Sequence, residues 1–290
     1  MKAYLGSDEI RKEKMGTTNV SQLGMVKGVD PTPPPPVISP IDPETIGGLL
    51  IYADAARSSV LVNGSGWIYG IQNRGSLGGL FTPYSTQATF ANFVKGSGST
   101  RYWEFRANTT NYMSTIYLNY PSGYTPKTTI SIAQMVYNTG PYAKARIWNH
   151  DTGPLHPKDL SSTTMDGAIP SQFDPAVTPN TALTPYPYTP ANTSYSMFAW
   201  SSPNYFGTTG SKFQTGLNNS TSATYGGTPG TPLPINHYFI NDWNRDTSPG
   251  GFTSGVNYHV AHMVYDSVLT EAQINGIYQY FDITRGYSML

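Results

Sequence analysis

The chain has 290 residues, a formal net charge of zero, no cysteine and only 12% charged residues, compared with about 25% in an average soluble domain. The absence of cysteine excludes disulfides and thiolate metal sites, and the neutral charge gives no reason to expect nucleic-acid binding. The chain has 22 tyrosines, 29 glycines and 24 prolines, but no apolar run of membrane length and no hydrophobic signal-peptide core, which predicts a turn-rich protein that is not inserted into a membrane.

Residues 1–29 contain a short internal repeat. Leu5-Gly-Ser-Asp-Glu-Ile10 aligns with Met15-Gly-Thr-Thr-Asn-Val20, and each copy is typical of a turn that leads into a short strand. Both copies are too short to bury a core alone, so we expect another surface to cover their apolar residues, Leu5, Ile10, Met15 and Val20. The repeat resembles the small N-terminal segments of many tailed-phage virion proteins, which implies an anchoring arm. A chance pair of β-turns is the alternative.

Residues 30–47 are predicted to form a stiff, extended linker. The run from Asp30 to Pro43 is dominated by proline, and each proline fixes its own φ and restricts the residue before it. Such a run acts as a spacer between the arm and the rest of the chain. A ligand for an SH3-type domain is the other interpretation, but no basic residue adjoins the run.

Residues 48 to about 150 are predicted to be a series of short strands. Each apolar or alternating run is bounded by Gly, Pro, Asn or Ser. The expected strands are Gly48–Asp54, Gly66–Gly70, Ala88–Val94, Tyr102–Arg106, Ser114–Leu118, Thr128–Tyr137 and Ala143–Trp148. Many short strands in succession predict an all-β domain.

From His150 to about Tyr195 the pattern dissolves into a proline-rich loop. A loop of this length in a compact domain is usually functional or packed on a partner. Strands are expected again at Tyr195–Trp200 and Asn236–Ile240, separated by a segment rich in Gly, Thr, Ser and Asn.

The C-terminal region is predicted to be one strand followed by one capped helix. Residues 256–265 alternate with a period of two, which predicts that His259 and His262 lie on opposite faces of the strand. Thr270 is a suitable N-cap, and the helix is expected to cover one end or face of the domain with Ile274, Ile277 and Phe281.

Two stretches carry a family resemblance. His259-Val-Ala-His-Met-Val-Tyr-Asp266 followed by Leu269-Thr-Glu-Ala-Gln-Ile274 resembles the C-terminal signature of concanavalin A-like, laminin-G-type jelly rolls, although His262 stands where a carboxylate or amide is more usual. Asp54-Ala-Ala-Arg-Ser-Ser59 resembles a corner of the same domains. The resemblance implies a concanavalin A-like jelly-roll β-sandwich over residues 48–290, with one C-terminal helix. It leaves one oxygen-ligated Ca²⁺ open, although no dense Asp/Asn loop supports it, and no other cofactor is expected.

The resemblance also raises glycoside hydrolysis, which needs two carboxyl groups flanking the scissile bond. The family arrangement Glu-x-Asp-x-x-Glu is absent, and Glu104 is the only glutamate between Gly48 and Asp266. We expect Glu104 to pair with Arg101 or Arg106. Asp242 and Asp246 could flank a cleft, but such residues more often make Asx turns. The histidines show no metal or triad pattern, so the chain is not predicted to be an enzyme.

Carbohydrate binding is a stronger hypothesis, because aromatic rings stack on sugar faces and neutral polar groups select hydroxyls. Candidate contacts in the loop-rich regions are Tyr186, Tyr188, Tyr205 and Trp243. The alternative is that these aromatic residues fill the sandwich or contact a neighbouring subunit.

These observations predict a structural or accessory protein of a tailed-phage virion, either a capsid decoration or a tail or baseplate component. Its arm would bind other virion proteins, and its lectin-like jelly roll would be displayed in several copies toward host-surface glycans. A lectin without a structural role and a glycoside hydrolase are the alternatives.

Overall fold

The fold is taken from a computed structural model that describes residues 38–84, 87–106, 110–124, 126–136, 146–151, 165–168, 195–201, 203, 212–215, 220–222, 235–241 and 256–289. The chain divides into two units at residue 37, and all the described residues belong to the second unit, Ile38–Leu290. Within this described part, no helix is both long and apolar enough to cross a bilayer.

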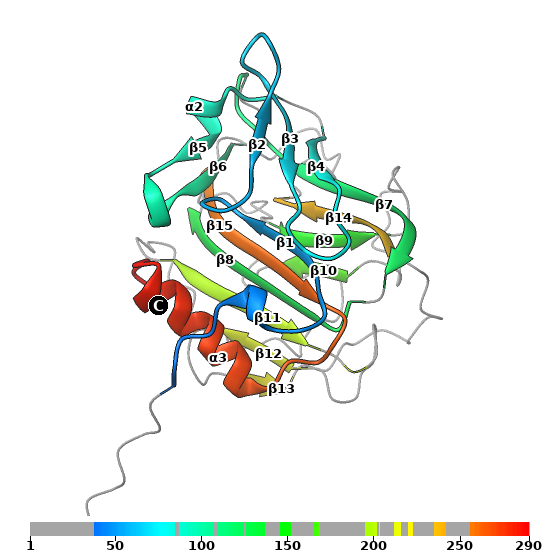
Figure 1. Ribbon diagram of the computed structural model, residues 1–290, viewed down its shortest axis with the longest axis vertical. Coiled ribbons are helices and arrows are strands. Elements are labelled where there is room, and N and C mark those ends of the chain that lie inside the picture. Colours follow the sequence, from blue (N-terminus) through cyan, green and yellow to red (C-terminus); the bar gives the residue numbers. More distant parts are fainter. Residues whose placement is uncertain are drawn as a thin grey trace, which may run out of the picture. The chain divides into compact units, whose positions relative to one another are not determined.

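The described strands form two antiparallel sheets that pack face to face (Figure 1). The first sheet has the order β13-β12-β11-β8-β15-β6-β5, and β1 also pairs with β15. Its strands are β1 (Leu49–Asp54), β5 (Val94–Lys95), β6 (Tyr102–Arg106), β8 (Thr128–Val136), β11 (Ser196–Ser201), β12 (Lys212–Thr215), β13 (Ser220–Ser222) and β15 (Val256–Tyr265).

The second sheet has the order β10-β9-β14-β7-β4-β3-β2. Its strands are β2 (Val60–Val62), β3 (Ile68–Gln72), β4 (Leu80–Pro83), β7 (Ile116–Tyr124), β9 (Arg146–Asp151), β10 (Met165–Ala168) and β14 (Ile235–Ile240). The predicted all-β sandwich with one C-terminal helix is therefore confirmed. The predicted extended arm lies outside the described residues.

One predicted strand is wrong in part. The segment Ala88–Val94 contains a short helix, α2 (Phe90–Phe93), and only its last residue enters a strand, β5. The helical turn directs Phe93 into the core, where its ring stacks on Trp103 with the centroids 5.9 Å apart. Phe90, at the other end of the turn, remains 42% exposed. Tertiary packing of one aromatic ring thus overrides the strand propensity of the segment.

The main core lies between the two sheets. Ile71, Phe81 and Leu118 from the second sheet meet Phe105 and Val264 from the first, and all five side chains are almost completely buried. Phe93 adds an edge-to-face contact with Phe105, with the centroids 5.1 Å apart. Burial of these apolar side chains is the main force that holds the sheets together.

Helix α3 (Glu271–Gln279) forms a third layer on the outer face of the first sheet. Its N-terminus carries the complete capping box of Thr270 and Gln273. Ile277 and Phe281 are fully buried and share an apolar cluster with Met263 of β15. The prediction that this helix covers a face of the sandwich is confirmed. The helix continues as a π-turn, Tyr280–Thr284, and Gly286 follows with a left-handed φ of 77°.

Residues 41–46, here called the strap, lie against α3. The amide of Ile41 donates a hydrogen bond of 2.9 Å to the carbonyl of Gly276, and a 3₁₀ turn, Pro43–Thr45, follows. The Tyr265 hydroxyl donates to the Pro43 carbonyl at 3.1 Å. These residues fall within the predicted linker, 30–47, and they are fixed on the sandwich.

A β-bulge in β15 changes the predicted facing of two histidines. Against β8, His259 pairs with Ala133 and Ala261 with Ile132, so Val260 is an extra residue with no partner. The extra residue shifts the alternation of side chains by one position. His259 and His262 therefore lie on the same face, with rings stacked 5.1 Å apart, and the prediction of opposite faces is wrong.

Candidate functional site

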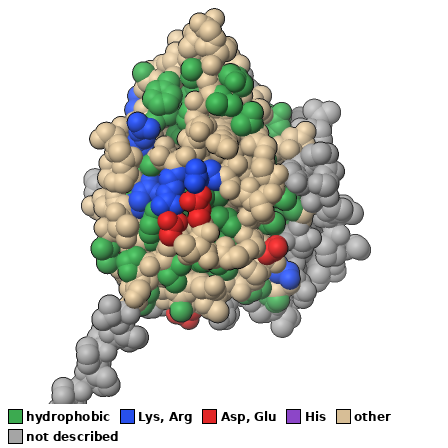
Figure 2. Space-filling model, viewed as in Figure 1, with side chains coloured by type: hydrophobic (Ala, Val, Ile, Leu, Met, Phe, Trp, Pro, Cys, Tyr) green, Lys and Arg blue, Asp and Glu red, His purple; other side chains and the backbone are tan. Residues whose placement is uncertain are grey.

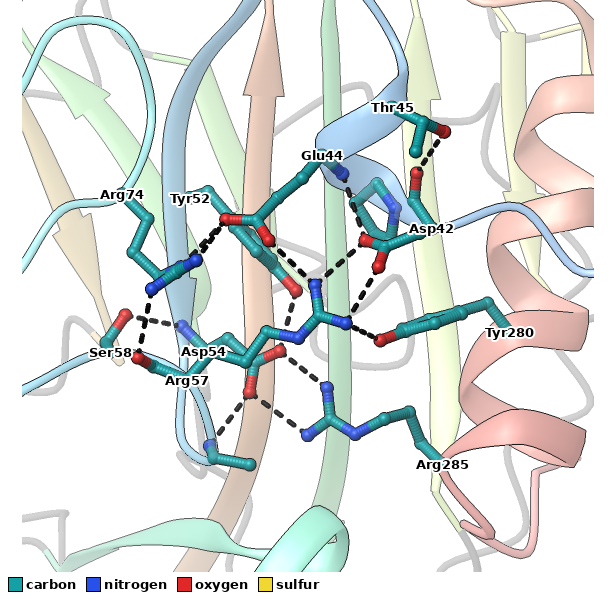
Figure 3. A network of polar contacts seen from close by, with 12 residues as sticks. Asp42, Glu44, Thr45, Tyr52, Asp54, Arg57, Ser58, Arg74, Tyr280 and Arg285 are labelled. Atoms are coloured by element: carbon teal, nitrogen blue, oxygen red, sulfur yellow. Dashed lines mark hydrogen bonds and ion pairs between the residues drawn. The ribbon is translucent and has the colours of Figure 1, made fainter.

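Three polar or aromatic regions of the sandwich are candidate sites. The first is a network around Asp54, at the end of β1 (Figure 3). Its carboxylate accepts two hydrogen bonds from Arg285, at 2.7 and 3.1 Å, and one from the Tyr52 hydroxyl at 2.6 Å. Asp54 is fully buried and Arg285 is 5% exposed. The pair joins β1 to the end of the C-terminal helical segment.

The network continues outward to the strap. Arg57 binds Asp42 through two contacts of 2.7 and 2.9 Å and Glu44 at 2.8 Å, and Glu44 also pairs with Arg74 at 2.7 Å. Burial alone would raise the pKa of Asp42, but the hydrogen bonds from Arg57 and from the Glu44 amide hold it below its ordinary value.

Figure 2 shows acidic and basic side chains gathered in one cluster on this face of the molecule. The network, here called the seam, contains three carboxylates and three arginines, namely Asp42, Glu44, Asp54, Arg57, Arg74 and Arg285. Its charges therefore balance, and each group is paired with another of the set. The seam fastens the strap, β1 and the C-terminal segment together, and it offers no excess charge to a ligand.

The second region is a chain of buried polar side chains between the sheets. His259 Nδ1 lies 2.9 Å from His262 Nε2, and His262 Nδ1 lies 2.8 Å from the Ser131 hydroxyl. The chain extends to Asn241, whose side-chain oxygen is 3.2 Å from His259 Nε2. Burial lowers the pKa of His259 to about 3 and, with the neighbouring His259, lowers that of His262 well below 6.5.

Both rings therefore stay neutral near pH 7 and satisfy each other's nitrogens. A hydrogen-bond distance between the two facing nitrogens leaves no space for an ion. Across the residues that the structure describes, no group of three or more His, Asp or Glu side chains is arranged to hold a metal. In this region, buried polar side chains satisfy one another's hydrogen-bonding groups within the core.

Glu104, the candidate carboxylate for hydrolysis, is a paired structural residue. It is 5% exposed and forms an ion pair with Arg106. Arg106 in turn stacks over the ring of Tyr112 at 4.1 Å. The expected pairing of Glu104 with a neighbouring arginine is confirmed.

The third region is the outer face of the second sheet, on the side away from the first sheet. Gln72 of β3 pairs with Leu80 of β4. Phe81 of β4 pairs with Leu118 of β7, and Thr82 pairs with Tyr117. The same register places Leu80 beside Asn119. Phe81 and Leu118 point into the core. Their neighbours in the alternation, Leu80, Thr82, Tyr117 and Asn119, therefore point outward.

Exposed aromatic rings border this grid. Tyr84 is 38% exposed, and its ring meets that of Tyr117 edge to face with centroids 5.8 Å apart. Tyr69, which lies at a β-bulge where β3 pairs with β2, is 46% exposed, and Leu80 is 37% exposed. We call Tyr69, Leu80, Tyr84 and Tyr117, together with Gln72, Thr82 and Asn119, the aromatic face.

The strands that build the aromatic face carry no formal charge. β2, β3, β4, β7 and β14 are adjacent in the sheet and contain no Asp, Glu, Lys or Arg. This surface combines rings and aliphatic groups with neutral amide and hydroxyl side chains. Such a surface can stack on an apolar ligand face and exchange hydrogen bonds with hydroxyl groups.

The site residues predicted from the sequence lie outside the described part of the chain. This holds for the arm residues Leu5, Ile10, Met15 and Val20, and for Tyr186, Tyr188, Tyr205 and Trp243. Asp242 and Asp246 lie there as well. The predictions for these residues stay predictions.

The aromatic face was not predicted from the sequence, although one signal for it was present. The predicted strand 114–118 contained Ile116, Tyr117 and Leu118, and its alternation places the Tyr117 ring opposite its two apolar neighbours. Tyr69 and Tyr84 carried no such signal, because one lies at a bulge and the other follows the end of β4.

Comparisons with known proteins give a likeness of fold. No known protein family and no curated protein matches the sequence. Trypanosoma rangeli sialidase in complex with the inhibitor DANA is similar at a TM-score of 0.48 and 11% identity, over 85% of this chain and 36% of that chain. The binding domain of botulinum neurotoxin DC in complex with SialylT is similar at a TM-score of 0.48 and 7% identity, over 82% and 52%. This chain therefore spans well under two thirds of either one.

Proposed function

We propose that this chain is a non-catalytic carbohydrate-binding protein of a tailed-phage virion. Its sandwich contacts host-surface glycans, and its N-terminal arm joins it, in several copies, to other virion proteins. The observation that supports glycan contact is the aromatic face, an exposed surface of rings and neutral polar groups on the outside of the second sheet.

The chemistry of the aromatic face suits a sugar. The C–H groups of a pyranose ring form an apolar surface that packs on Tyr84 or Tyr117, and such contacts gain from both dispersion and burial. Gln72 and Asn119 are exposed and each offers a donor and an acceptor to the sugar hydroxyls. A surface built on strands also loses little backbone freedom on binding, because the strands are held by their ladders.

The arm is proposed as the anchor because its two repeat copies are too short to bury Leu5, Ile10, Met15 and Val20 on their own. The strap lies with α3 on the outer face of the first sheet, while the aromatic face lies on the outer face of the second. The chain thus comes to the sandwich on the layer opposite the aromatic face.

The proposal excludes catalysis. Glu104, which the sequence offers as a catalytic carboxylate, is buried and held by Arg106. If the chain hydrolysed glycosides through this residue, Glu104→Gln would abolish turnover. We expect the parent protein to release no product from any glycan that it binds.

Glycan binding is tested by calorimetry on the full chain with Tyr84→Ala and Tyr117→Ala. Each substitution should weaken binding about fivefold or more, because a stacking partner contributes about 1 kcal/mol or more. Phe90→Ala is the matched control, since Phe90 is also an exposed aromatic residue (42%) but lies outside the aromatic face. Equal affinities for all three variants and the parent would contradict the proposal.

The anchor is tested separately with a protein that begins at Ile38 and retains the strap. It should remain folded and bind the same glycans, but it should no longer be incorporated into phage particles. A second variant with Leu5, Ile10, Met15 and Val20 changed to Ser tests whether the apolar residues of the arm are responsible. Full incorporation of both variants would overturn the anchoring role.

A further inference from the structure

We infer that the glycan bound by the aromatic face is a neutral one, and that acidic sugars such as sialic acid, uronic acids or phosphorylated sugars are rejected. The inference rests on the proposed glycan contact and specifies its substrate class. The preference for neutral sugars follows from the distribution of charged side chains: the strands of the aromatic face have none, and the charged groups of the seam are paired with one another.

Among the residues that the structure describes, the strands of the aromatic face hold no cation for an acidic sugar. The five adjacent strands from β2 to β14 contain no Lys or Arg. The next strand, β9, brings Arg146 and Asp151, one residue of each sign. Binding an anion at a partly desolvated surface requires a charge-assisted partner, and the cost of desolvating an unpaired carboxylate exceeds that of a neutral hydroxyl.

Five of the positive side chains in the described residues are engaged away from the aromatic face, and two more, Arg101 and Lys127, directly precede β6 and β8 of the first sheet. Arg57, Arg74 and Arg285 belong to the seam, and Arg106 is paired with Glu104. The Lys95 ammonium donates to the Ala91 carbonyl at 2.7 Å, beside β5 of the first sheet. These groups are committed to internal contacts, so they do not supply the missing charge.

Backbone amides do not replace a cation at this surface. Strands β4 and β7 lie inside the sheet, with neighbours on both sides, so their N–H groups are directed along the sheet to adjacent strands. Above the sheet remain the side chains of Gln72, Thr82 and Asn119. Amides and hydroxyls match sugar hydroxyls in both donor and acceptor roles.

The test uses the full chain and matched pairs of oligosaccharides. Lactose- and N-acetyllactosamine-type oligosaccharides are compared with the same compounds bearing one terminal sialic acid, together with neutral glucans, at 50 and 500 mM NaCl. We expect binding of a neutral oligosaccharide, at least tenfold weaker binding of its sialylated counterpart, and less than a twofold change with salt.

Tighter binding of the sialylated member, lost at high salt and in Tyr84→Ala, would overturn this inference and leave glycan contact by the aromatic face intact. Binding of no oligosaccharide, or binding unchanged by Tyr84→Ala and Tyr117→Ala, would instead contradict the proposed function and the inference with it.

A variant that adds a positive charge gives a second test of the preference for neutral over acidic sugars. Gln72→Lys introduces an ammonium beside Leu80 at an exposed position of the aromatic face. It should raise the affinity for the sialylated compounds several-fold and make that affinity salt-dependent. Ser76→Lys adds the same charge at an exposed loop position outside the aromatic face and should leave the preference unchanged. An acidic preference already present in the parent and unaffected by Gln72→Lys would refute the inference.

Discussion

The two outer faces of this sandwich differ in their content of charged side chains. The side covered by α3 and the strap holds a seam of three acidic and three basic side chains, all paired. The opposite side, formed by the second sheet, has five adjacent strands with no charged residue, from β14 to the edge strand β2. In a chain with only 12% charged residues, this contrast separates a side that holds the fold together from the side proposed to bind glycans. Substitutions on the first side should cost stability, and substitutions on the second should cost affinity.

The largest effect is expected for Ile277→Asp on the helix side. Ile277 is fully buried between α3 and the first sheet, and the change adds an unpaired charge and removes an apolar contact. We expect a loss of about 4 kcal/mol or more in the free energy of unfolding, measured with denaturant. Ile283→Asp is the control, because Ile283 is 64% exposed. Similar losses in both variants would show that α3 is not packed as described.

The next effect is expected within the seam. Arg285→Met leaves Asp54 buried without its main partner, which should cost about 3 kcal/mol or more. Arg74→Met removes a cation whose side chain is 34% exposed, and it should cost less than about 1 kcal/mol. Denaturant unfolding of the two variants separates the buried pair from the surface pair. A smaller loss for Arg285→Met than for Arg74→Met would contradict this division of the seam.

The buried histidines predict a loss of stability in mild acid. The folded-state pKa of His259 is about 3, and that of His262 is also lowered, so the unfolded chain binds protons below pH 6.5 that the folded chain does not. Their contribution is complete above pH 6.5 and declines as the pH falls below it. For His259 the decline between pH 7 and 5 is about 2 kcal/mol. Unfolding measurements at the two pH values test this. The double variant His259→Gln, His262→Gln should show a flatter pH dependence, and an unchanged slope would exclude these residues as its source.

A smaller effect is expected where the strap meets α3. A Cβ atom on Gly276 would lie 2.4 to 3.0 Å from three side-chain atoms of Ile41, so Gly276→Ala should cost about 1–2 kcal/mol despite its better helix propensity. Gly276→Ala combined with Ile41→Ala should recover most of that loss, because the two closest atoms are then removed and only the Cβ atom at 3.0 Å remains. Unfolding of the two single variants and the double variant measures the coupling. Additive losses would place the clash elsewhere.

The smallest effect on stability is expected on the aromatic face. Tyr84→Ala removes a ring that is 38% exposed, so the unfolding free energy should change by at most about 1 kcal/mol. The same variant should still bind glycans more weakly than the parent. A large stability loss in Tyr84→Ala would mean that this ring stabilises the fold. Tyr84 would then contradict the assignment of the aromatic face to binding and not to stability.

The sequence alone predicted the elements whose signal is local. The strand 256–265, the Thr270 cap and the buried positions of α3 follow from periodicity and capping, and all are present. The facing of His259 and His262 could not be predicted, because the unpaired Val260 is visible only against its partner strand. The seam was equally hidden, since Asp54 and Arg285 lie 231 residues apart and meet only in the fold. The aromatic face required the register of β3, β4 and β7, which no local pattern provides.

The strap also determines how the sandwich would respond to pulling. Force applied through the arm enters the sandwich at residue 38. Before it reaches β1, it acts on the Ile41–Gly276 hydrogen bond and on the two hydrogen bonds between Arg57 and Asp42. β1 is itself paired with β15, the strand that also pairs with β6 and β8 at the centre of the first sheet. The contacts of the strap should therefore break first under such a force and re-form when it is released. The pairing of β1 with β15 bears the force only after they have broken. We expect single-molecule extension from the N-terminus to show a small reversible event before the main rupture, and Arg57→Ala to remove it.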